Sequence, residues 1–419
     1  IVLTIQNYMS NYVLIIALLG AGLWFSFRLG FIQVRGFGEG MKRTFGGLFS
    51  KKGEAGADGM SSFQALATAI AAQVGTGNIA GAATALAIGG PGAIFWMWIA
   101  AFLGMATIYA EAIMAQKYKT VGADGQVTGG PVYYIRAAFK GTFGKVLAGI
   151  FAILITLALG FMGNAVQSNS IAASFHTAFG IPQWIMGLVV AVIAIFVFMG
   201  GMKRIAKVTE TIVPFMAALY IIGSLIVIIY NYKNIPYAFA SIFIGAFSPS
   251  SVVGGAAGAT VKLALTKGVA RGLFSNEAGM GSTPHAHAVA KVDHPVEQGF
   301  VAMTGVFIDT FVVLNLTALV ILTTKSIPSG KTGAELSQYA FSTLYGKGGD
   351  IFVAICMFFF AFSTIIGWYF FGQANIKYLF GPKAVKIYSA AAAVCVFLGS
   401  LAEVDLVWNM VDCFNSLMV

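Results

Sequence analysis

The sequence predicts an all-α membrane protein with about eleven transmembrane helices. Hydrophobic residues make up 58% of the 419 residues and charged residues only 10%, whereas a soluble domain carries roughly a quarter charged residues. The apolar residues form successive runs of about 20, which is the length a helix needs to cross a bilayer. Two of these runs are interrupted by glycines and polar side chains. We therefore expect residues 1–419 to form a single membrane domain.

The predicted spans follow one another with short polar loops between them. They cover residues 11–28, 61–88, 92–116, 146–175, 183–200, 209–230, 253–284, 298–324, 351–376, 384–400 and 404–419. The first span is expected to be retained rather than cleaved as a signal peptide. Its basic residues, beginning with Arg28 and Arg35, follow the apolar run instead of preceding it.

The two interrupted spans, 61–88 and 253–284, lie five spans apart in the chain. The first contains Gln73-Val74-Gly75-Thr76-Gly77-Asn78, and the second is interrupted over residues 271–279. Each glycine weakens a helix by roughly 1 kcal/mol and permits an unwound backbone. Such a pair is typical of two inverted five-helix repeats, with the binding site where the breaks meet. The expected parts of the domain are an extra N-terminal helix and cytoplasmic loop at 1–50, a first repeat at 61–230 and a second repeat at 253–419.

The net charge of +10 does not indicate a nucleic-acid partner, because the Lys and Arg residues are scattered through short loops and form no basic face. Most of them lie in the loops that follow the first, third, fifth, seventh and ninth spans. Cytoplasmic loops are enriched in basic residues. We therefore expect a multi-pass protein of the cell membrane with its N-terminus outside and its C-terminus in the cytoplasm. The segments 28–60 and 117–145 should be cytoplasmic.

The break at residues 73–78 offers the ligands that a zwitterion and a cation require. A helix interrupted in hydrocarbon leaves N–H groups on one half and C=O groups on the other half without partners. The N–H groups of residues 76–78 suit a carboxylate, and the C=O groups of residues 71–74 suit Na⁺ or an ammonium group. The alternative is that Gly75 and Gly77 only allow two helices to pack closely.

Two further spans carry hydroxyl and amide side chains in apolar surroundings. Ser363 and Thr364 interrupt an aromatic run, and their oxygens are hard, neutral ligands of the kind Na⁺ uses; the alternative is that each bonds back to the carbonyl one turn earlier. Asn164, Gln167 and Ser168 share one helix face by their i, i+3, i+4 spacing. That face should contact either a substrate or another helix.

The intramembrane carboxylates Asp309 and Glu111 could carry a proton or bind a cation, and Asp309 is the better candidate because Glu111 lies nearer the end of its span. Three histidines gather at His285, His287 and His294. Their i, i+2 spacing in a proline-bearing segment suits a metal site poorly. The sequence contains no Ser/His/Asp or HExxH arrangement, so it predicts neither an enzyme nor a bound cofactor.

Three motifs resemble those of one transporter family. Residues 89–104 read Gly-Gly-Pro-Gly-Ala-Ile-Phe-Trp-Met-Trp-Ile-Ala-Ala-Phe-Leu-Gly, residues 129–135 read Gly-Gly-Pro-Val-Tyr-Tyr-Ile, and residues 274–282 read Phe-Ser-Asn-Glu-Ala-Gly-Met-Gly-Ser. They resemble signatures of the alanine or glycine:cation symporters, also called sodium:alanine symporters or amino acid carrier proteins. The resemblance implies the inverted-repeat fold of the bacterial neurotransmitter:sodium symporters, preceded by one extra helix.

The function that this resemblance implies is sodium-coupled symport of a small neutral amino acid, alanine with glycine as the second option, into the cell by alternating access. Proton coupling through Asp309 is the alternative. A channel would require a continuous polar pore lining and an intramembrane enzyme would require paired catalytic groups, and the sequence has neither pattern. The partners implied are the amino acid, Na⁺ as coupling ion and the lipid bilayer.

The resemblance also implies two sets of ligands. The substrate-binding residues would be Gln73, Thr76, Gly77, Asn78, Gln167, Phe274, Ser275, Asn276 and Trp368. Within that set, the amides of Thr76 and Gly77 would hold the carboxylate, and the carbonyls of Gln73, Phe274 and Ser275 would hold the amine. Sodium would bind the carbonyls of Ala71, Val74 and Phe360 and the hydroxyls of Ser363 and Thr364. The chain departs from the family at 313–317, where Val-Leu-Asn-Leu-Thr replaces the more usual Cys-Thr after the aspartate.

Overall fold

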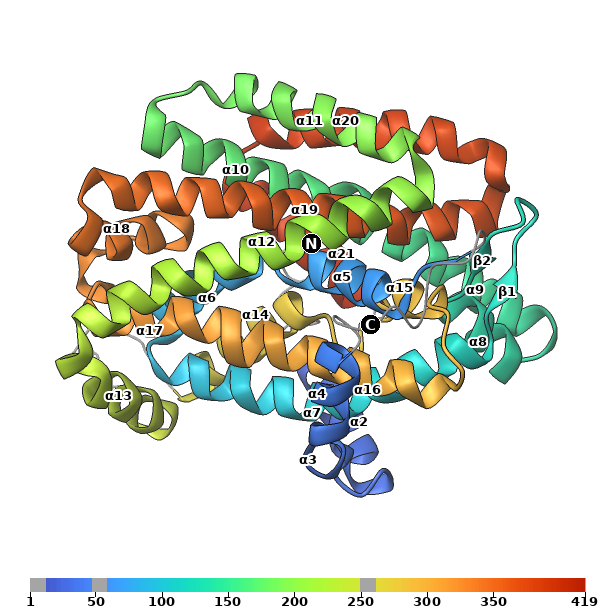
Figure 1. The fold of residues 1–419 in the computed structure, drawn as a ribbon, viewed down its shortest axis with the longest axis horizontal. Coiled ribbons are helices and arrows are strands. Elements are labelled where there is room, and N and C mark those ends of the chain that lie inside the picture. Colours follow the sequence, from blue (N-terminus) through green and yellow to red (C-terminus); the bar gives the residue numbers. More distant parts are fainter. Residues whose placement is uncertain (1–12, 47–58, 249–260, 419) are drawn as a thin grey trace.

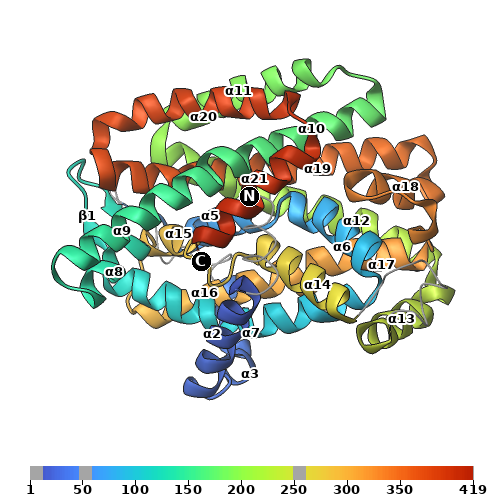
Figure 2. The same ribbon diagram turned by 180° about the vertical axis from the view of Figure 1, so that it is seen from behind.

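The computed structural model describes residues 13–46, 59–248 and 261–418, and almost all of this part is helical. Most of the long helices lie side by side along the longest axis of the molecule (Figures 1 and 2). Six helical stretches in the described residues are long and apolar enough to cross a membrane: Gly92–Lys117, Gly141–Phe179, Gly201–Tyr230, Pro295–Thr323, Lys347–Phe380 and Pro382–Leu401. Shorter apolar helices cover Leu14–Arg28, Gly77–Gly89 and Gln183–Met199.

The elements are named in chain order. They are α2 (Leu14–Arg28), α3 (Ile32–Arg35), α4 (Phe37–Gly46), α5 (Ser62–Gln73), the π-helical η3 (Gly77–Gly81), α6 (Ala82–Gly89), α7 (Gly92–Lys117), β1 (Thr120–Val121), β2 (Val127–Thr128), α8 (Pro131–Ala138), α9 (Gly141–Ile155), the π-helical η4 (Thr156–Gly163), α10 (Asn164–Phe179), α11 (Gln183–Met199), α12 (Gly201–Tyr230), η5 (Tyr232–Asn234), α13 (Ile235–Phe247), α14 (Val261–Asn276), α15 (Pro284–Ala288), α16 (Pro295–Val306), the π-helical η7 (Phe307–Leu314), α17 (Asn315–Thr323), η8 (Ile327–Ser329), α18 (Gly333–Tyr345), α19 (Lys347–Phe380), η9 (Pro382–Ala384), α20 (Val385–Leu401) and α21 (Val404–Met418).

The helices pack in two groups on either side of the centre. In one group α7 packs against α2, α14 and α16, and in the other α10 packs against α19 and α20 while α11 packs against α20. The helix α19 touches α5, α10, α12 and α18, so it runs through the middle of the molecule (Figure 1). Large apolar side chains on the outer helices face outward: Phe196, Ile229 and Ile387 are 67%, 65% and 75% exposed. Such exposure fits a surface that contacts lipid rather than water.

The first interrupted helix breaks where the glycines predict. The helix α5 begins with a capping box between Ser61 and Gln64 and ends at Gln73. Val74 and Gly75 are not helical, and the chain resumes through the wide turn of η3 into α6. The side chain of Asn78 closes the gap, because its Oδ1 accepts a hydrogen bond of 3.0 Å from the amide of Gly75.

The second interrupted helix ends at the last residue of α14, and residues 277–283 are non-helical before α15. Glu277, Gly279 and Gly281 adopt left-handed conformations, with φ of 57°, 86° and 71°. The unwound backbone is satisfied from outside, since Glu111 on α7 accepts hydrogen bonds from the amides of Gly279 (3.0 Å) and Gly281 (3.1 Å). Glu111 therefore stabilises the break by accepting hydrogen bonds from its amides. The sequence had suggested Glu111 only as an ion or proton site.

The structure differs from the predicted spans in several places. The span expected at 146–175 belongs to one continuous stretch over Gly141–Phe179, and the span expected at 209–230 begins at Gly201. The helices α8, α13 and α18 and the antiparallel β1–β2 pair, which pairs Thr120 with Thr128, occupy segments that were expected to be loops. These elements are too short to cross a bilayer, so a pattern of membrane-length apolar runs does not predict them. Residues 253–260 of the span expected at 253–284 lie outside the described residues.

Candidate functional site

Four of the five predicted sodium oxygens come together where α5 ends against the middle of α19. The hydroxyl of Thr364 donates to the carbonyls of Ala71 (2.9 Å) and Phe360 (3.0 Å). The hydroxyl of Ser363 lies 2.8 Å from the carbonyl of Phe360 and 3.4 Å from that of Ala71. The carbonyl of Val74, the fifth expected ligand, stays a prediction. Each hydroxyl therefore bonds back within α19, as the alternative interpretation expects, and also reaches the end of α5; their role as sodium ligands stays a prediction.

Close packing of the two helices makes this convergence possible. A Cβ added to Gly75 would overlap the Thr364 hydroxyl, and one added to Gly367 would lie 2.9 Å from the Cβ of Ala72. Any larger residue at either position would separate the carbonyl of Ala71 from the hydroxyls of α19. The glycines of the break therefore serve both of the proposed purposes, unwinding and close approach.

The first amide of the expected carboxylate site is paired within the protein. The amide of Thr76 donates to Oε1 of Gln167 on α10, at 3.1 Å. Four buried polar atoms, two at the first break and two on α10, have no hydrogen-bond partner among the described residues: Gln73 Oε1, Thr76 Oγ1, Asn164 Oδ1 and Ser168 Oγ. Buried polar atoms without partners are rare in proteins and indicate a place where a polar ligand or water belongs.

The two breaks contact each other directly. The side chain of Gln73 donates to the carbonyl of Asn276 at 2.7 Å. A Cβ added to Gly77 would lie 3.1 Å from the Cα of Ser275, so the backbone of η3 rests against the end of α14. The side chain of Asn276 is itself engaged, because it accepts from the amide of Ala278 (3.1 Å) and donates to Thr310 (3.3 Å).

Asp309 on η7 contacts residues of both breaks and is fully buried. Its carboxyl accepts hydrogen bonds from Asn78 (2.7 Å), from Ser275 (3.1 Å to each oxygen) and from the hydroxyl of Thr310 (2.9 Å). The side chains of Asn78 and Ser275, both expected to bind substrate, therefore bind this carboxyl in the structure. Asp309 is the group that ties the two interrupted helices to the helix formed by α16, η7 and α17.

Three aromatic rings, those of Phe274, Trp368 and Trp408, form an aromatic column beside the second break. The ring of Phe274 packs edge-on against Trp368, with centroids 5.8 Å apart, and lies 5.1 Å from the ring of Trp408 on α21. The guanidinium of Arg271 sits over Trp408 at 4.6 Å and pairs with both carboxylate oxygens of Asp412, at 3.2 and 3.1 Å. Arg271 and Trp408 also line a cavity of about 430 Å³ that extends towards α18.

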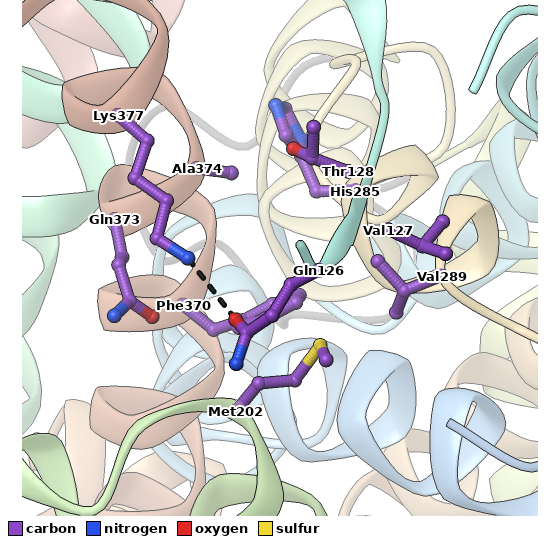
Figure 3. A pocket seen from close by; sticks show the side chains of 10 residues that line it. All are labelled: Gln126, Val127, Thr128, Met202, His285, Val289, Phe370, Gln373, Ala374 and Lys377. Atoms are coloured by element: carbon purple, nitrogen blue, oxygen red, sulfur yellow. Dashed lines mark hydrogen bonds between the residues drawn. The ribbon is translucent and has the colours of Figure 1, made fainter. Parts of the chain in front are cut away.

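A much smaller pocket of about 20 Å³ lies near the opposite end of the molecule, between the β1–β2 pair, α15 and the end of α19 (Figures 1 and 3). Lys377 reaches across it to Gln126 at 3.2 Å, as Figure 3 shows, and pairs with Asp124 at 2.6 Å. Burial acts to raise the pKa of Asp124, but the ammonium of Lys377 outweighs it and holds that pKa below its usual value. The pair of Lys377 and Asp124 therefore joins the end of α19 to the loop between β1 and β2.

The clustered histidines make separate contacts. His285 lies between the carbonyl of Ser282 (2.8 Å) and the side chain of Asn375 (2.9 Å), and it borders the small pocket in Figure 3. His287 pairs with Gln298, and His294 accepts from the amide of Val296 at the start of α16. Over residues 13–46, 59–248 and 261–418 no three His, Cys, Asp or Glu side chains are grouped to hold a metal ion.

Sequence reasoning missed two charged groups at the centre. Glu277 is 1% exposed and accepts hydrogen bonds from Trp368 and Ser282, and Arg271 pairs with Asp412. Both residues were visible in the sequence as ionisable groups inside an interrupted span. Such groups mark functional positions in membrane proteins, so the signal was present.

The sequence pattern of one known family matches this chain over its whole length. The pattern describes the sodium:alanine symporter family and covers residues 1–419. The chain belongs to the sodium:alanine symporter family. The family consists of transporters, which confirms the predicted class of function over an enzyme or a channel. The multi-pass membrane location and the resemblance of the three motifs are confirmed with it.

Curated relatives align over nearly all of the chain. A sodium/alanine symporter of Methanococcus maripaludis is 43% identical over 99% of this chain and 91% of its own. An amino-acid carrier protein of Bacillus subtilis is 43% identical over 96% of this chain and 83% of its own. A further Bacillus subtilis relative, described as a probable sodium/glutamine symporter, is 41% identical over 99% of this chain and 84% of its own.

A solved structure shares the fold at much lower sequence identity. A manganese transporter of Eremococcus coleocola, solved as a mutant, superposes with a TM-score of 0.57 and 14% identity, over 85% of this chain and 75% of that one. At this identity the likeness concerns the fold alone.

Proposed function

We propose that this chain carries alanine into the cell together with Na⁺, by alternating access around the two helix breaks. The observation that carries the proposal is the meeting of Ala71, Phe360, Ser363 and Thr364, whose four oxygens come from two helices, the interrupted α5 and the long α19. Neutral carbonyl and hydroxyl oxygens at the end of a broken helix are the ligands that coupling Na⁺ uses in transporters. The relatives described as sodium/alanine symporter and amino-acid carrier support the same pairing of ion and substrate.

The substrate carboxylate is proposed to bind the amides of Thr76 and Gly77, at the positive end of η3 and α6. In the structure Gln167 offers its Oε1 to the Thr76 amide, which is the interaction a carboxylate oxygen would make. We infer that the Gln167 side chain satisfies this amide until substrate arrives and then turns to bind the ligand. The carbonyls of Gln73, Phe274 and Ser275 would face the ammonium group. Asn78 and Asn276 would support the breaks through Asp309 and Thr310.

Small substrates fit this arrangement best. The backbones of η3 and α14 are in contact at Gly77 and Ser275, and the fully buried ring of Trp368 with Phe274 closes the other side. Alanine, with glycine as a second substrate, is therefore the substrate we propose. The glutamine relative makes glutamine the competing substrate, and its longer side chain would need more space beside Trp368.

Two regions at opposite ends of the molecule would open in turn during alternating access. The cavity of about 430 Å³ on the α18 side ends at Arg271, Asp412 and the aromatic column, which would open to admit substrate. The pair of Lys377 and Asp124 closes the other end. Because the loops near the Lys377 end carry most of the basic residues, we propose that this end faces the cytoplasm and that the N-terminus lies outside. Eleven spans in the arrangement of an N-terminal helix and two inverted repeats, 61–230 and 253–419, account for the two breaks.

Proton coupling is the second candidate, and one observation favours it. Asp309 is buried, accepts hydrogen bonds only from neutral donors and has no basic partner among the described residues. A carboxyl in that setting can exchange a proton during the transport cycle.

Uptake by the purified protein in liposomes distinguishes the candidates. Radiolabelled alanine should accumulate when an inward Na⁺ gradient is imposed, and it should not accumulate when Li⁺, K⁺ or an inward proton gradient replaces Na⁺. Accumulation driven by a proton gradient without Na⁺ would instead assign the coupling to Asp309. An excess of unlabelled glycine or glutamine added outside measures which substrate competes with alanine.

A further inference from the structure

Glu277 is a buried carboxylate that the proposed cycle does not use. It follows α14 directly, is 1% exposed and adopts a left-handed backbone conformation with φ of 57°. One oxygen accepts the indole N–H of Trp368 and the other accepts the hydroxyl of Ser282. No ion pair to Glu277 occurs in the described part of the chain. This conformation is uncommon for a non-glycine residue, and together with the buried side chain it points to a specific role for Glu277.

The indole that Glu277 holds is fixed at three points. The ring lies against Gly163 of η4, where an added Cβ would overlap Cζ3 of Trp368. A second face meets the ring of Phe274 edge-on, with centroids 5.8 Å apart. The third point is the hydrogen bond from Nε1 to Glu277, and within residues 13–46, 59–248 and 261–418 it is the one hydrogen bond of the ring. Packing limits where the indole can lie, and the hydrogen bond selects one orientation among those that packing allows.

We infer that Glu277 is a positioning residue that fixes the Trp368 ring as a wall of the substrate site and thereby excludes amino acids with side chains larger than that of alanine. The inference deepens the proposed function and rests on it, because it assumes that substrate binds between the breaks and Trp368. The side chain of Glu277 is suited to this role because it carries two oxygens, so one can accept the indole N–H while the other bonds to Ser282. Ser282 holds the second oxygen, so the carboxylate itself cannot turn away.

Four variants separate positioning from other roles. Glu277→Gln keeps an oxygen acceptor at the same reach. Glu277→Asn tolerates the left-handed backbone but is too short to reach Trp368. Trp368→Phe keeps an aromatic ring and removes the N–H. Trp98→Phe is the matched control, because the Trp98 N–H has no hydrogen-bond partner in the structure.

The first measurement is the ratio of the inhibition constants of leucine and alanine against radiolabelled alanine uptake in proteoliposomes. Glu277→Asn and Trp368→Phe should each lower the leucine-to-alanine ratio by at least about tenfold, corresponding to roughly 1.4 kcal/mol of lost discrimination. Glu277→Gln and Trp98→Phe should stay within about threefold of the unmodified protein. Equal weakening of both ligands in Glu277→Asn would overturn the inference. So would loss of alanine binding in Glu277→Gln with discrimination intact in Trp368→Phe, because the charge would then act on the ligand itself.

The second measurement does not depend on transport. Protein labelled with 5-fluorotryptophan gives a ¹⁹F resonance for residue 368, which is assigned by its disappearance in Trp368→Phe. Without substrate, this resonance should shift or broaden in Glu277→Asn and remain at its place in Glu277→Gln. An unchanged resonance in Glu277→Asn refutes the positioning role even if alanine transport is verified. A moved resonance with no alanine uptake by the unmodified protein would refute the proposed function while keeping the role of Glu277 in holding the ring.

Discussion

Removing the two hydroxyls of α19 tests the ion site most directly. The variant Ser363→Ala with Thr364→Val takes away two of the four converging oxygens and leaves the carbonyls of Ala71 and Phe360 in place. Valine has nearly the shape of threonine, and alanine is smaller than serine by one oxygen. The packing between α5 and α19 should therefore survive, and the change should act on ion binding.

The expected loss of Na⁺ affinity follows from comparing the contacts of the hydroxyls in the ion-bound and ion-free states. A hydrogen bond or ligand contact to a charged group is worth about 1.5–3 kcal/mol, so two oxygens contribute roughly 3–6 kcal/mol to the ion-bound state. The ion-free state also loses stability, because the same hydroxyls donate to the carbonyls of Ala71 and Phe360 when no ion is bound. The difference between the two states is therefore nearer the lower value, about 3 kcal/mol. The half-activating Na⁺ concentration should rise roughly a hundredfold.

The assay is alanine uptake in proteoliposomes as a function of external Na⁺, with thermal unfolding of each purified variant measured alongside. Thr364→Ser retains the oxygen and should stay close to the unmodified protein. Thr323→Val is the matched control, since the buried Thr323 hydroxyl donates only to carbonyls of its own helix, at Leu319 and Val320. An unchanged Na⁺ response of the double variant would remove α19 from the ion site. An equal shift in Thr323→Val would attribute the effect to loss of a back-bonded hydroxyl in general.

Three further predictions concern the substrate site, the buried carboxyl and the orientation. Gly77→Ala should weaken alanine binding by roughly 1–3 kcal/mol, about five- to 150-fold, because its Cβ would press on the backbone of α14. Gly81→Ala should bind alanine normally, because the nearest atom to its Cβ would be 3.9 Å away. Equal alanine binding by the two variants, measured by calorimetry, would contradict the contact between the breaks. Asp309→Asn should lower alanine affinity at least about tenfold through loss of charged hydrogen bonds but keep the Na⁺ response of uptake, and a loss of that response would assign the ion to Asp309. In a protein without its own cysteines, Lys233→Cys should react with an impermeant maleimide on intact cells and Lys42→Cys should not; the reverse pattern would invert the orientation.

The interruptions could be predicted from sequence because the signal is local. Gly75 and Gly77, only two positions apart and flanked by Gln73 and Asn78 within a run of apolar residues, lower the cost of unwinding the helix at that point. The break at Val74 and Gly75 lies where that argument places it. The hydroxyl pair was recognised for the same reason, since two polar residues stand out within an aromatic run.

The partners across the breaks could not be predicted, because they depend on which helices pack together. Ala71 and Thr364 are separated by 293 positions, and nothing in the spacing of either segment indicates the other; only the family resemblance joined them. The pairing of the Thr76 amide with Gln167 and that of Glu111 with two amides are likewise set by tertiary packing. The short helices α13 and α18 fall below the length that a search for membrane spans detects.

The ends of the first break lie only a few residues apart, and this spacing has a thermodynamic consequence. The carbonyl of Ala71, which contacts Thr364 on α19, would face the ion, and the amide of Thr76 would face the substrate. Ordering this single stretch for one ligand leaves less to be ordered for the other, so the two affinities are linked. Linkage is reciprocal: the factor by which Na⁺ tightens alanine binding equals the factor by which alanine tightens Na⁺ binding. A fall in external Na⁺ would therefore weaken the capture of alanine at the outer face in addition to reducing the force that drives it inward.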